Sequence, residues 1–271
     1  MSTIEAIVLG LVQGLTEFLP ISSSGHLRIV PALVGWDDPG AAFTAVIQLG
    51  TMAAVLLYFR RDLWNIAVAW LRELRLPYRR RSHEANLGWF IILGTIPISI
   101  FGVIFSDQIE SGARDLYLIG SALILFSFVM LAAERVGSRR RQLADVDVRD
   151  GAFIGVAQAL ALIPGVSRSG ATISAGLFRG FDRAAAARYS FLLSVPAVVL
   201  SGLYELKDIG EGDTASVAAT AIATLVAFVS GYAAIAWLLR YLANHTLDIF
   251  VAYRIPLGIL VLVLAATGAI S

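Results

Sequence analysis

The sequence predicts an all-α polytopic membrane protein on three observations: an excess of apolar residues, long apolar stretches and an internal repeat. Of the 271 residues, 58% are hydrophobic and 15% are charged, and the mean hydropathy is +0.77. Soluble domains average roughly 45–50% apolar and about 25% charged residues. The net charge of only +1 excludes the basic surface of a nucleic-acid-binding protein. The absence of cysteine excludes disulfides, thiolate metal sites and cysteine nucleophiles.

Six stretches are apolar and long enough to cross the hydrocarbon core of a bilayer, which takes roughly 20 helical residues. They cover approximately residues 41–58, 88–105, 115–133, 186–204, 217–239 and 249–270. We expect each stretch to form a transmembrane helix. Together they predict a single integral membrane domain over residues 1–271.

Two further apolar regions, about 4–34 and 151–180, are interrupted by Pro/Ser/Gly clusters at 19–26 and 164–170. About 15 helical residues precede each interruption, and they reach only about 22 Å. Each region therefore predicts a re-entrant helical hairpin. Non-helical backbone at that depth is tolerated only where protein or a water-filled cavity surrounds it. We expect the two tips to lie against each other or to line a cleft.

A shift of 145 residues superposes the two hairpins without a gap. Gly10, Gln13, Leu15, Ser22, Ser24 and Gly25 meet Gly155, Gln158, Leu160, Ser167, Ser169 and Gly170. Each hairpin precedes three predicted spans, and this odd number places the two halves in opposite orientations. The sequence thus predicts an inverted-topology repeat, with one half at about 1–145 and the other at about 146–271. Sites in such proteins form near the midplane, where broken helices meet.

Charged residues are distributed unevenly between the predicted loops. Arginines gather after the first and third spans, at 60–81 and 135–149, whereas the 106–114 and 205–215 loops are mainly acidic. The positive-inside rule places the basic loops in the cytoplasm. The first hairpin and both termini then lie outside, and the second hairpin opens to the cytoplasm. Several charged residues lie near the ends of the predicted segments, and we expect them to contact lipid headgroups or to form ion pairs. They are Arg28, Arg179, Asp182, Arg183, Arg188 and Arg254.

The first tip combines a carboxylate, hydroxyls and an imidazole. Gln13 and Glu17 are four residues apart and share one helix face. A carboxylate inside an apolar segment costs on the order of 3 kcal/mol, so Glu17 is expected to be functional or paired. The tip itself carries Ser22, Ser23, Ser24 and His26. Three serines before a glycine also suit turn and cap formation, but together with Glu17 the group predicts a nucleophile-and-base set.

The second tip carries a cation and hydroxyls, namely Ser167, Arg168, Ser169 and Thr172. Hydroxyls, a guanidinium and backbone N–H groups at a helix start form a site suited to phosphate. In the repeat, Glu17 corresponds to Leu162 and Arg168 corresponds to Ser23. One half therefore supplies the acid/base set, and the other half supplies the anion clamp.

These motifs resemble those of the bacterial undecaprenyl-diphosphate phosphatases, the bacitracin-resistance proteins. The family's (E/Q)xxxE element appears at 13–17, its serine/histidine tip at 22–26 and its PGxSRSxxT element at 164–172. The resemblance extends over the whole chain and includes 46–50 and 190–196. It implies hydrolysis of undecaprenyl diphosphate to the monophosphate in the bacterial inner membrane, which recycles the lipid carrier of cell-wall synthesis. It also implies dependence on Mg²⁺ or Ca²⁺, with Glu17 as a ligand, although Gln13 in place of a second glutamate weakens a paired-carboxylate metal site.

The expected mechanism follows from these roles. The polyprenyl diphosphate enters a cleft that faces the outer side, with its tail among the membrane lipids, and Arg168, Ser167, Ser169 and Thr172 bind its phosphates. Ser23 attacks and His26 accepts its proton, or His26 or a water attacks instead. Glu17 orients His26 or holds the cation. Gln13, Ser22, Ser24 and Gln48 support the site. The alternative is a polyprenyl-phosphate flippase, alone or combined with the phosphatase, because inverted repeats with broken helices are typical of transporters.

Overall fold

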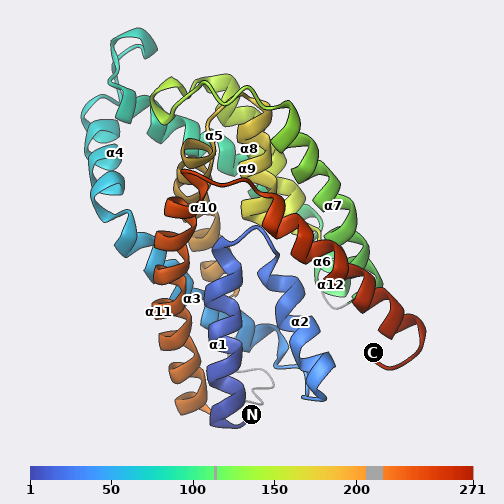
Figure 1. Cartoon of the computed structure of the whole chain (residues 1–271). Helices are drawn as coiled ribbons and strands as arrows, with labels where there is room; N and C mark the ends of the chain where they lie inside the picture. The colour runs from blue at the N-terminus through green and yellow to red at the C-terminus, as the bar shows by residue number, and fades with distance from the viewer. Residues whose placement is uncertain (113–114, 206–215, 271) are drawn as a thin grey trace.

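The computed structural model describes residues 1–112, 115–205 and 216–270, and its regular elements there are all helices (Figure 1). In the first half these are α1 (Thr3–Phe18), α2 (Ser23–Val34), α3 (Gly40–Tyr58), α4 (Arg60–Arg72), η1 (Tyr78–Arg80), α5 (His83–Ile104), α6 (Ser106–Gly112) and α7 (Leu116–Val136). They continue with η2 (Leu143–Asp145), α8 (Val148–Ala159), η3 (Leu160–Leu162), α9 (Arg168–Phe178), α10 (Arg183–Glu205), α11 (Val217–Leu242) and α12 (Asp248–Ala266). The predicted all-α class is confirmed.

The long apolar helices agree with the predicted membrane spans. By length and composition, α5, α7, α10, α11 and α12 can each cross a membrane. A sixth span results if α3 and α4, which meet at an angle of 73°, count as one broken segment. All six predicted stretches fall on these helices, so the chain is a multi-pass membrane protein. Of the two acidic loops, Arg114 and residues 206–215 lie outside the described residues.

The basic segment after the first span forms a helix, α4, where the sequence analysis expected a loop. Arginines lie at both of its ends, Arg60 and Arg72, and Ile66 is buried while Trp64 is 71% exposed. An amphipathic helix with arginine and tryptophan on its outer face suits the membrane–water interface. The sharp bend from α3 into α4 is consistent with a turn from a spanning direction to a surface direction.

The two regions predicted as hairpins each form a broken helix pair, α1 with α2 and α8 with α9. The backbone takes the same unusual conformation at both breaks, with φ of 76° at Ser22 and 78° at Ser167. Positive φ is rare for residues other than glycine and costs on the order of 1–3 kcal/mol. Each serine hydroxyl also caps the following helix, because it accepts a hydrogen bond from the amide of Gly25 or Gly170. The two breaks therefore share conformation as well as sequence.

Glycines allow each hairpin to pack closely on a long helix. α1 lies along α11, and α8 lies along α5. A Cβ at Gly10 would lie 2.4 Å from the carbonyl oxygen of Ala223, and a Cβ at Gly155 would lie 2.3 Å from the Cα of Gly94. Neither position accepts a side chain without displacement of the backbone. In Figure 1, α1 begins at one end of the molecule, at the N-terminus, and α8 and α9 lie toward the opposite end.

Aromatic packing fixes the end of α1 against α10. Phe18 makes an edge-to-face contact with Phe191, with ring centroids 5.5 Å apart, and Phe59 lies 6.1 Å from the same ring. All three rings are buried. This cluster holds the C-terminal turn of α1, which carries Glu17, close to the middle of α10.

Candidate functional site

The two hairpin tips meet, and an ion pair joins them. Arg168 at the start of α9 donates to Oε1 of Glu17 in the last turn of α1. The hydroxyl of Ser169 donates to the backbone carbonyl of Leu19, at 3.1 Å. The side chains of Glu17 and Arg168 are only 7% and 18% exposed. The structure thus brings together the carboxylate of one repeat half and the guanidinium of the other.

Glu17 is the centre of a hydrogen-bond network. Its Oε2 accepts from the hydroxyl of Ser23, at 2.6 Å, and from Nε2 of Gln13, at 3.2 Å. Nε2 of Gln13 also donates to the hydroxyl of Thr51 on α3, at 3.4 Å, and that hydroxyl donates to the backbone carbonyl of Gln48. Sequence reasoning missed Thr51, because a threonine in an apolar helix usually only bonds to its own backbone.

His26 does not occupy the predicted position between Ser23 and Glu17. Its Nδ1 lies 2.7 Å from the carbonyl of Ser22, and its Nε2 lies 2.7 Å from the hydroxyl of Tyr253 on α12. A carbonyl only accepts, so Nδ1 donates, and Nε2 of the neutral ring accepts from Tyr253. The expected order, in which Glu17 orients His26 and His26 activates Ser23, is therefore replaced by direct contact between Ser23 and Glu17.

The remaining tip serines form two equivalent pairs. The hydroxyls of Ser22 and Ser24 lie 3.3 Å apart, and those of Ser167 and Ser169 lie 3.2 Å apart. In each pair the first serine is the helix cap, and in the first tip the second serine is exposed. Each tip thus carries the same pair of serine hydroxyls at its break.

Thr172 connects α9 with α10. Its hydroxyl donates to the carbonyl of Arg168, at 2.8 Å, and lies 2.5 Å from the hydroxyl of Ser190. Thr172 is 1% exposed, and it is Ser190 that reaches the cleft beside the ion pair. Thr172 is therefore placed to hold the first turn of α9, and Ser190 is placed to meet a ligand.

A narrow cleft of about 10 Å³ opens at the ion pair. It is lined by Glu17, Phe18, Arg168, Ser169, Ser190, Phe191 and Ser194. That volume is about the space of one water molecule. Sequence reasoning noted 190–196 only as part of the family resemblance. The spacing of Ser190 and Ser194, four apart on one face of a helix, was the available signal.

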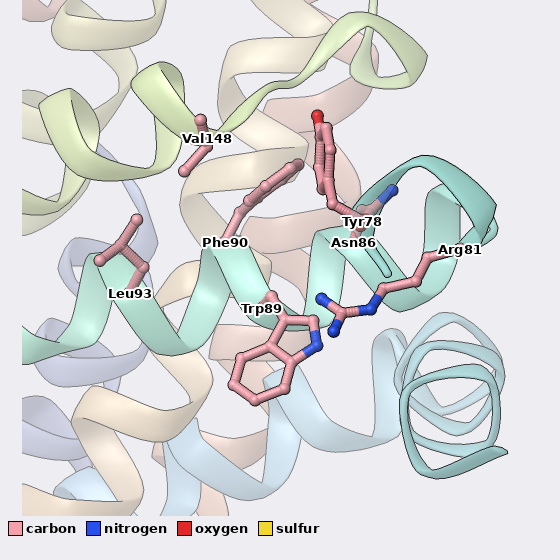
Figure 2. A pocket seen from close by; sticks show the side chains of 7 residues that line it. All are labelled: Tyr78, Arg81, Asn86, Trp89, Phe90, Leu93 and Val148. Carbon is pink, nitrogen blue, oxygen red and sulfur yellow. The ribbon is translucent and has the colours of Figure 1, made fainter. Parts of the chain in front are cut away.

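A larger cavity of about 370 Å³ lies away from the tips, at the start of α5 (Figure 2). It is lined by Tyr78, Arg81, Asn86, Trp89, Phe90, Leu93 and Val148. Arg81 lies over the ring of Trp89, at 5.3 Å from its centroid, and donates to the carbonyl of Leu76. The lining contains no carboxylate, and these contacts give Arg81 a structural role.

The side chains at the tips supply one anionic oxygen donor group. Within the described residues no cluster of three or more His, Cys, Asp or Glu side chains is placed to hold a metal ion. Glu17 is the carboxylate of the network, and both of its oxygens already accept hydrogen bonds. Mg²⁺ and Ca²⁺ take six or more oxygen ligands. These side chains therefore fit a divalent cation only if a ligand supplies further oxygens.

Comparison with known proteins identifies the family. A profile described as bacitracin resistance protein BacA matches residues 6–260. The chain belongs to this family. It is 55% identical to an undecaprenyl-diphosphatase of Nocardioides sp. (strain ATCC BAA-499 / JS614), over 99% of this chain and 98% of that protein. An undecaprenyl-diphosphatase of Thermobifida fusca (strain YX) is 55% identical over 100% of this chain and 93% of that protein. One of Mycobacterium sp. (strain KMS) is 54% identical over 100% of this chain and 99% of that protein.

The part of the chain that matches the BacA family also includes a buried cation that sequence reasoning misplaced. Arg254 was expected near the end of a span, in contact with lipid headgroups or in an ion pair. It is instead 0% exposed in the interior of α12, where its guanidinium contacts both hairpin breaks. An arginine inside a predicted apolar span was the signal that could have found it.

Proposed function

We propose that this BacA family member is an undecaprenyl-diphosphatase, which hydrolyses undecaprenyl diphosphate to undecaprenyl phosphate and inorganic phosphate. This reaction recycles the lipid carrier of cell-wall synthesis and accounts for bacitracin resistance. Relatives that carry this name are about 55% identical over nearly the full chain. The observation that carries the proposal is a carboxylate bound to a hydroxyl and to a guanidinium where the two broken helix pairs meet.

In the proposed reaction, Arg168 turns from Glu17 to the diphosphate and balances the charge that develops during phosphoryl transfer. Ser23 attacks the terminal phosphorus while its proton passes to Oε2 of Glu17. The Oγ–P bond forms, the P–O bond to the bridging oxygen breaks, and undecaprenyl phosphate leaves. A water molecule then hydrolyses the phosphoserine. In the substrate complex the hydroxyls of Ser167, Ser169 and Ser190 turn from their present partners to donate to the phosphate oxygens, and Thr172 holds the helix turn that carries Arg168.

His26 has a supporting role in this proposal. Both of its ring nitrogens have partners, Ser22 and Tyr253. It therefore stabilises the turn that presents Ser23. Gln13 fixes Oε2 of Glu17. Thr51 in turn holds Gln13, and the carbonyl of Gln48 holds the hydroxyl of Thr51.

A divalent cation, Mg²⁺ or Ca²⁺, is proposed to bind together with the substrate. Glu17 and the hydroxyl of Ser23 would be its protein ligands, and diphosphate oxygens would complete the set. When bound, the cation neutralises phosphate charge. Calorimetric titration of Ca²⁺ should therefore show binding only when a non-hydrolysable diphosphate is present.

The architecture is proposed to be an inverted-topology repeat in the inner membrane, with repeat halves at about 1–145 and 146–271. The equivalent breaks at Ser22 and Ser167, and the equivalent packing of α1 on α11 and of α8 on α5, support it. The arginine-rich segments are assigned to the cytoplasm and the active site to the outer side. Single cysteines in this cysteine-free chain test the topology. An impermeant maleimide should label Ala269→Cys in intact cells, and Arg80→Cys only after permeabilisation.

Phosphate release by the purified protein tests the function. In detergent, the wild-type protein should release phosphate from both a C15 and a C55 diphosphate, and EDTA should suppress the release. Ser23→Ala should abolish it and also abolish a phosphoserine adduct detected by mass spectrometry after rapid quench. Binding of the lipid diphosphate without phosphate release would contradict the proposed enzyme. Full activity of Ser23→Ala would assign the attack to water.

A further inference from the structure

Arg254 makes an unusual set of contacts for a buried charge. Its NH1 donates to the carbonyl of Pro20, at 3.1 Å, and its NH2 donates to the carbonyl of Gly165, at 2.9 Å. The same guanidinium donates from Nε to the hydroxyl of Ser127, at 3.1 Å, and from NH2 to the carbonyl of Ala122 on α7. Within the described parts of the chain, it forms no salt bridge with a carboxylate, although it is 0% exposed. The guanidinium of Arg254 therefore binds mainly backbone carbonyl groups.

The two carbonyls at the breaks are equivalent in the repeat, because Pro20 and Gly165 are 145 residues apart. Both lie where the helix is interrupted, so neither carbonyl has the partner that a continuous helix would provide. An unpaired carbonyl at membrane depth is strongly unfavourable. One planar guanidinium satisfies both, and it thereby ties the first tip to the second at one point.

The position of this contact relates it to catalysis. Pro20 is three residues from Glu17 and from Ser23, and Gly165 is three residues from Arg168. The neighbouring residue on α12, Tyr253, holds His26 of the first tip. A shift of either tip would change the distance between the carboxylate, the hydroxyl and the guanidinium.

We propose that Arg254 is the positioning residue that holds the two hairpin tips in register, so that Glu17 and Ser23 face Arg168. The fork of the guanidinium is required, because the single ammonium of a lysine does not present two donors in fixed directions to two carbonyls. An apolar side chain at this position leaves both carbonyls unpaired and lowers stability, whereas lysine keeps a buried cation. A role in positioning therefore predicts that kcat falls by more than the loss of folded protein accounts for. The kinetic part of this inference rests on the proposed phosphatase function.

Kinetics and thermal stability of Arg254→Met and Arg254→Lys test the proposal. We expect kcat for phosphate release to fall about 10- to 100-fold in both variants, with KM changed by less than about threefold, because misplacement of about 1 Å costs up to this much. The melting temperature of Arg254→Met should fall, because the carbonyls of Pro20 and Gly165 lose their donor, whereas that of Arg254→Lys, which keeps a buried donor, should fall less. Arg135→Met, which removes an exposed arginine of α7 paired with Asp248, is the matched control and should keep wild-type kcat.

A second readout is independent of activity. In the cysteine-free chain, Leu19→Cys and Ser169→Cys place one thiol on each tip, at positions that are in contact through a hydrogen bond. Oxidant-driven cross-linking of this pair should be fast with Arg254 and at least severalfold slower with Arg254→Met or Arg254→Lys. If the wild-type protein released no phosphate, the proposed function would fail, but the cross-linking rates would still test the positioning.

Two results would overturn the inference. One is wild-type kcat together with wild-type cross-linking in both Arg254 variants. The other is loss of kcat only in proportion to the loss of folded protein, with an unchanged cross-linking rate in the folded fraction. If Arg254→Met does not fold, Arg254→Lys, which keeps the buried cation, decides between these outcomes with the same two measurements.

Discussion

At the scale of single residues, Glu17 determines how the site works. Its two carboxylate oxygens accept from three side chains, Arg168, Ser23 and Gln13, that come from three different helices or helix turns. Charge-assisted hydrogen bonds of this kind are stronger than neutral ones. The carboxylate therefore joins the tips, and in the proposed reaction it receives the proton of Ser23.

Glu17→Gln tests this double role. The amide keeps the size of the side chain but cannot accept the serine proton, so we expect phosphate release to fall about 100- to 1,000-fold, the range for loss of a general base. Stability should fall by only about 1–3 kcal/mol, because Arg168 keeps some access to solvent. Glu5→Gln, on the same helix in an exposed cap, is the control and should keep full activity. Activity of Glu17→Gln within threefold of the wild type would remove Glu17 from the chemistry.

At the scale of elements, the packing of the hairpin helices fixes the positions of the two tips. Each consists of two short helices that cannot span the membrane alone, and each packs its glycines directly on the backbone of a long helix. Close packing without side chains leaves little freedom for α8 to slide along α5. The depth of the tip is therefore set by the long helix.

Gly155→Ala tests this packing. The new Cβ would lie 2.3 Å from the Cα of Gly94, so α8 must move away from α5, at a cost of about 1–3 kcal/mol for overpacking. We expect a lower melting temperature and reduced activity in the same variant. Gly102→Ala on α5 is the matched control, since its nearest neighbour is a Leu162 methyl at 3.8 Å, and it should be neutral or slightly stabilising. Equal melting temperatures for the two variants would show that the α5–α8 contact is not tight.

At the scale of the whole molecule, ion pairs consolidate the arginine-rich face. Buried Asp150 accepts from Arg141, at 2.9 Å, and from Arg179, at 2.6 Å, and buried Glu134 accepts from Arg183. These contacts tie the segment between the two repeat halves to α8, α9 and α10. Burial alone would raise the pKa of Asp150, but hydrogen bonds from Arg141 and Arg179 outweigh it and lower the pKa below its ordinary value.

This shift predicts how stability depends on pH. The pKa of Asp150 is lower in the folded state than in the unfolded state. Its ionised carboxylate therefore contributes fully to the free energy of unfolding above the ordinary carboxyl pKa of about 4. This contribution is lost as the pH falls through the lower, folded-state pKa. Asp150→Asn should lower the free energy of unfolding by about 2 kcal/mol at neutral pH. The difference in melting temperature from the wild type should shrink below about pH 4. A constant difference across the acid range would contradict the assignment, and Glu84→Gln, an exposed carboxylate of α5, should show no such change.

The membrane spans and the residues with unusual chemistry could be predicted from the sequence, because both are local properties. Apolar length indicates a span, and Glu17 and Arg168 stand out since charges are costly in apolar segments. The partners of these residues could not be predicted in the same way. Tyr253 reaches His26 from 227 positions away, and Ser190 meets Thr172 only because α10 packs on α9. Such contacts depend on how the helices pack against one another, and the sequence of a single segment does not reveal this packing.

The ion pair between the tips also bears on what happens after the reaction. The guanidinium of Arg168 already has an anionic partner inside the protein, so every lipid headgroup that binds there competes with Glu17. A diphosphate carries more negative charge than a monophosphate and is the stronger competitor. In the proposed reaction, Glu17 regains Arg168 once the terminal phosphate is lost, and the lipid product is displaced. We therefore expect little product inhibition in a bilayer that contains the product.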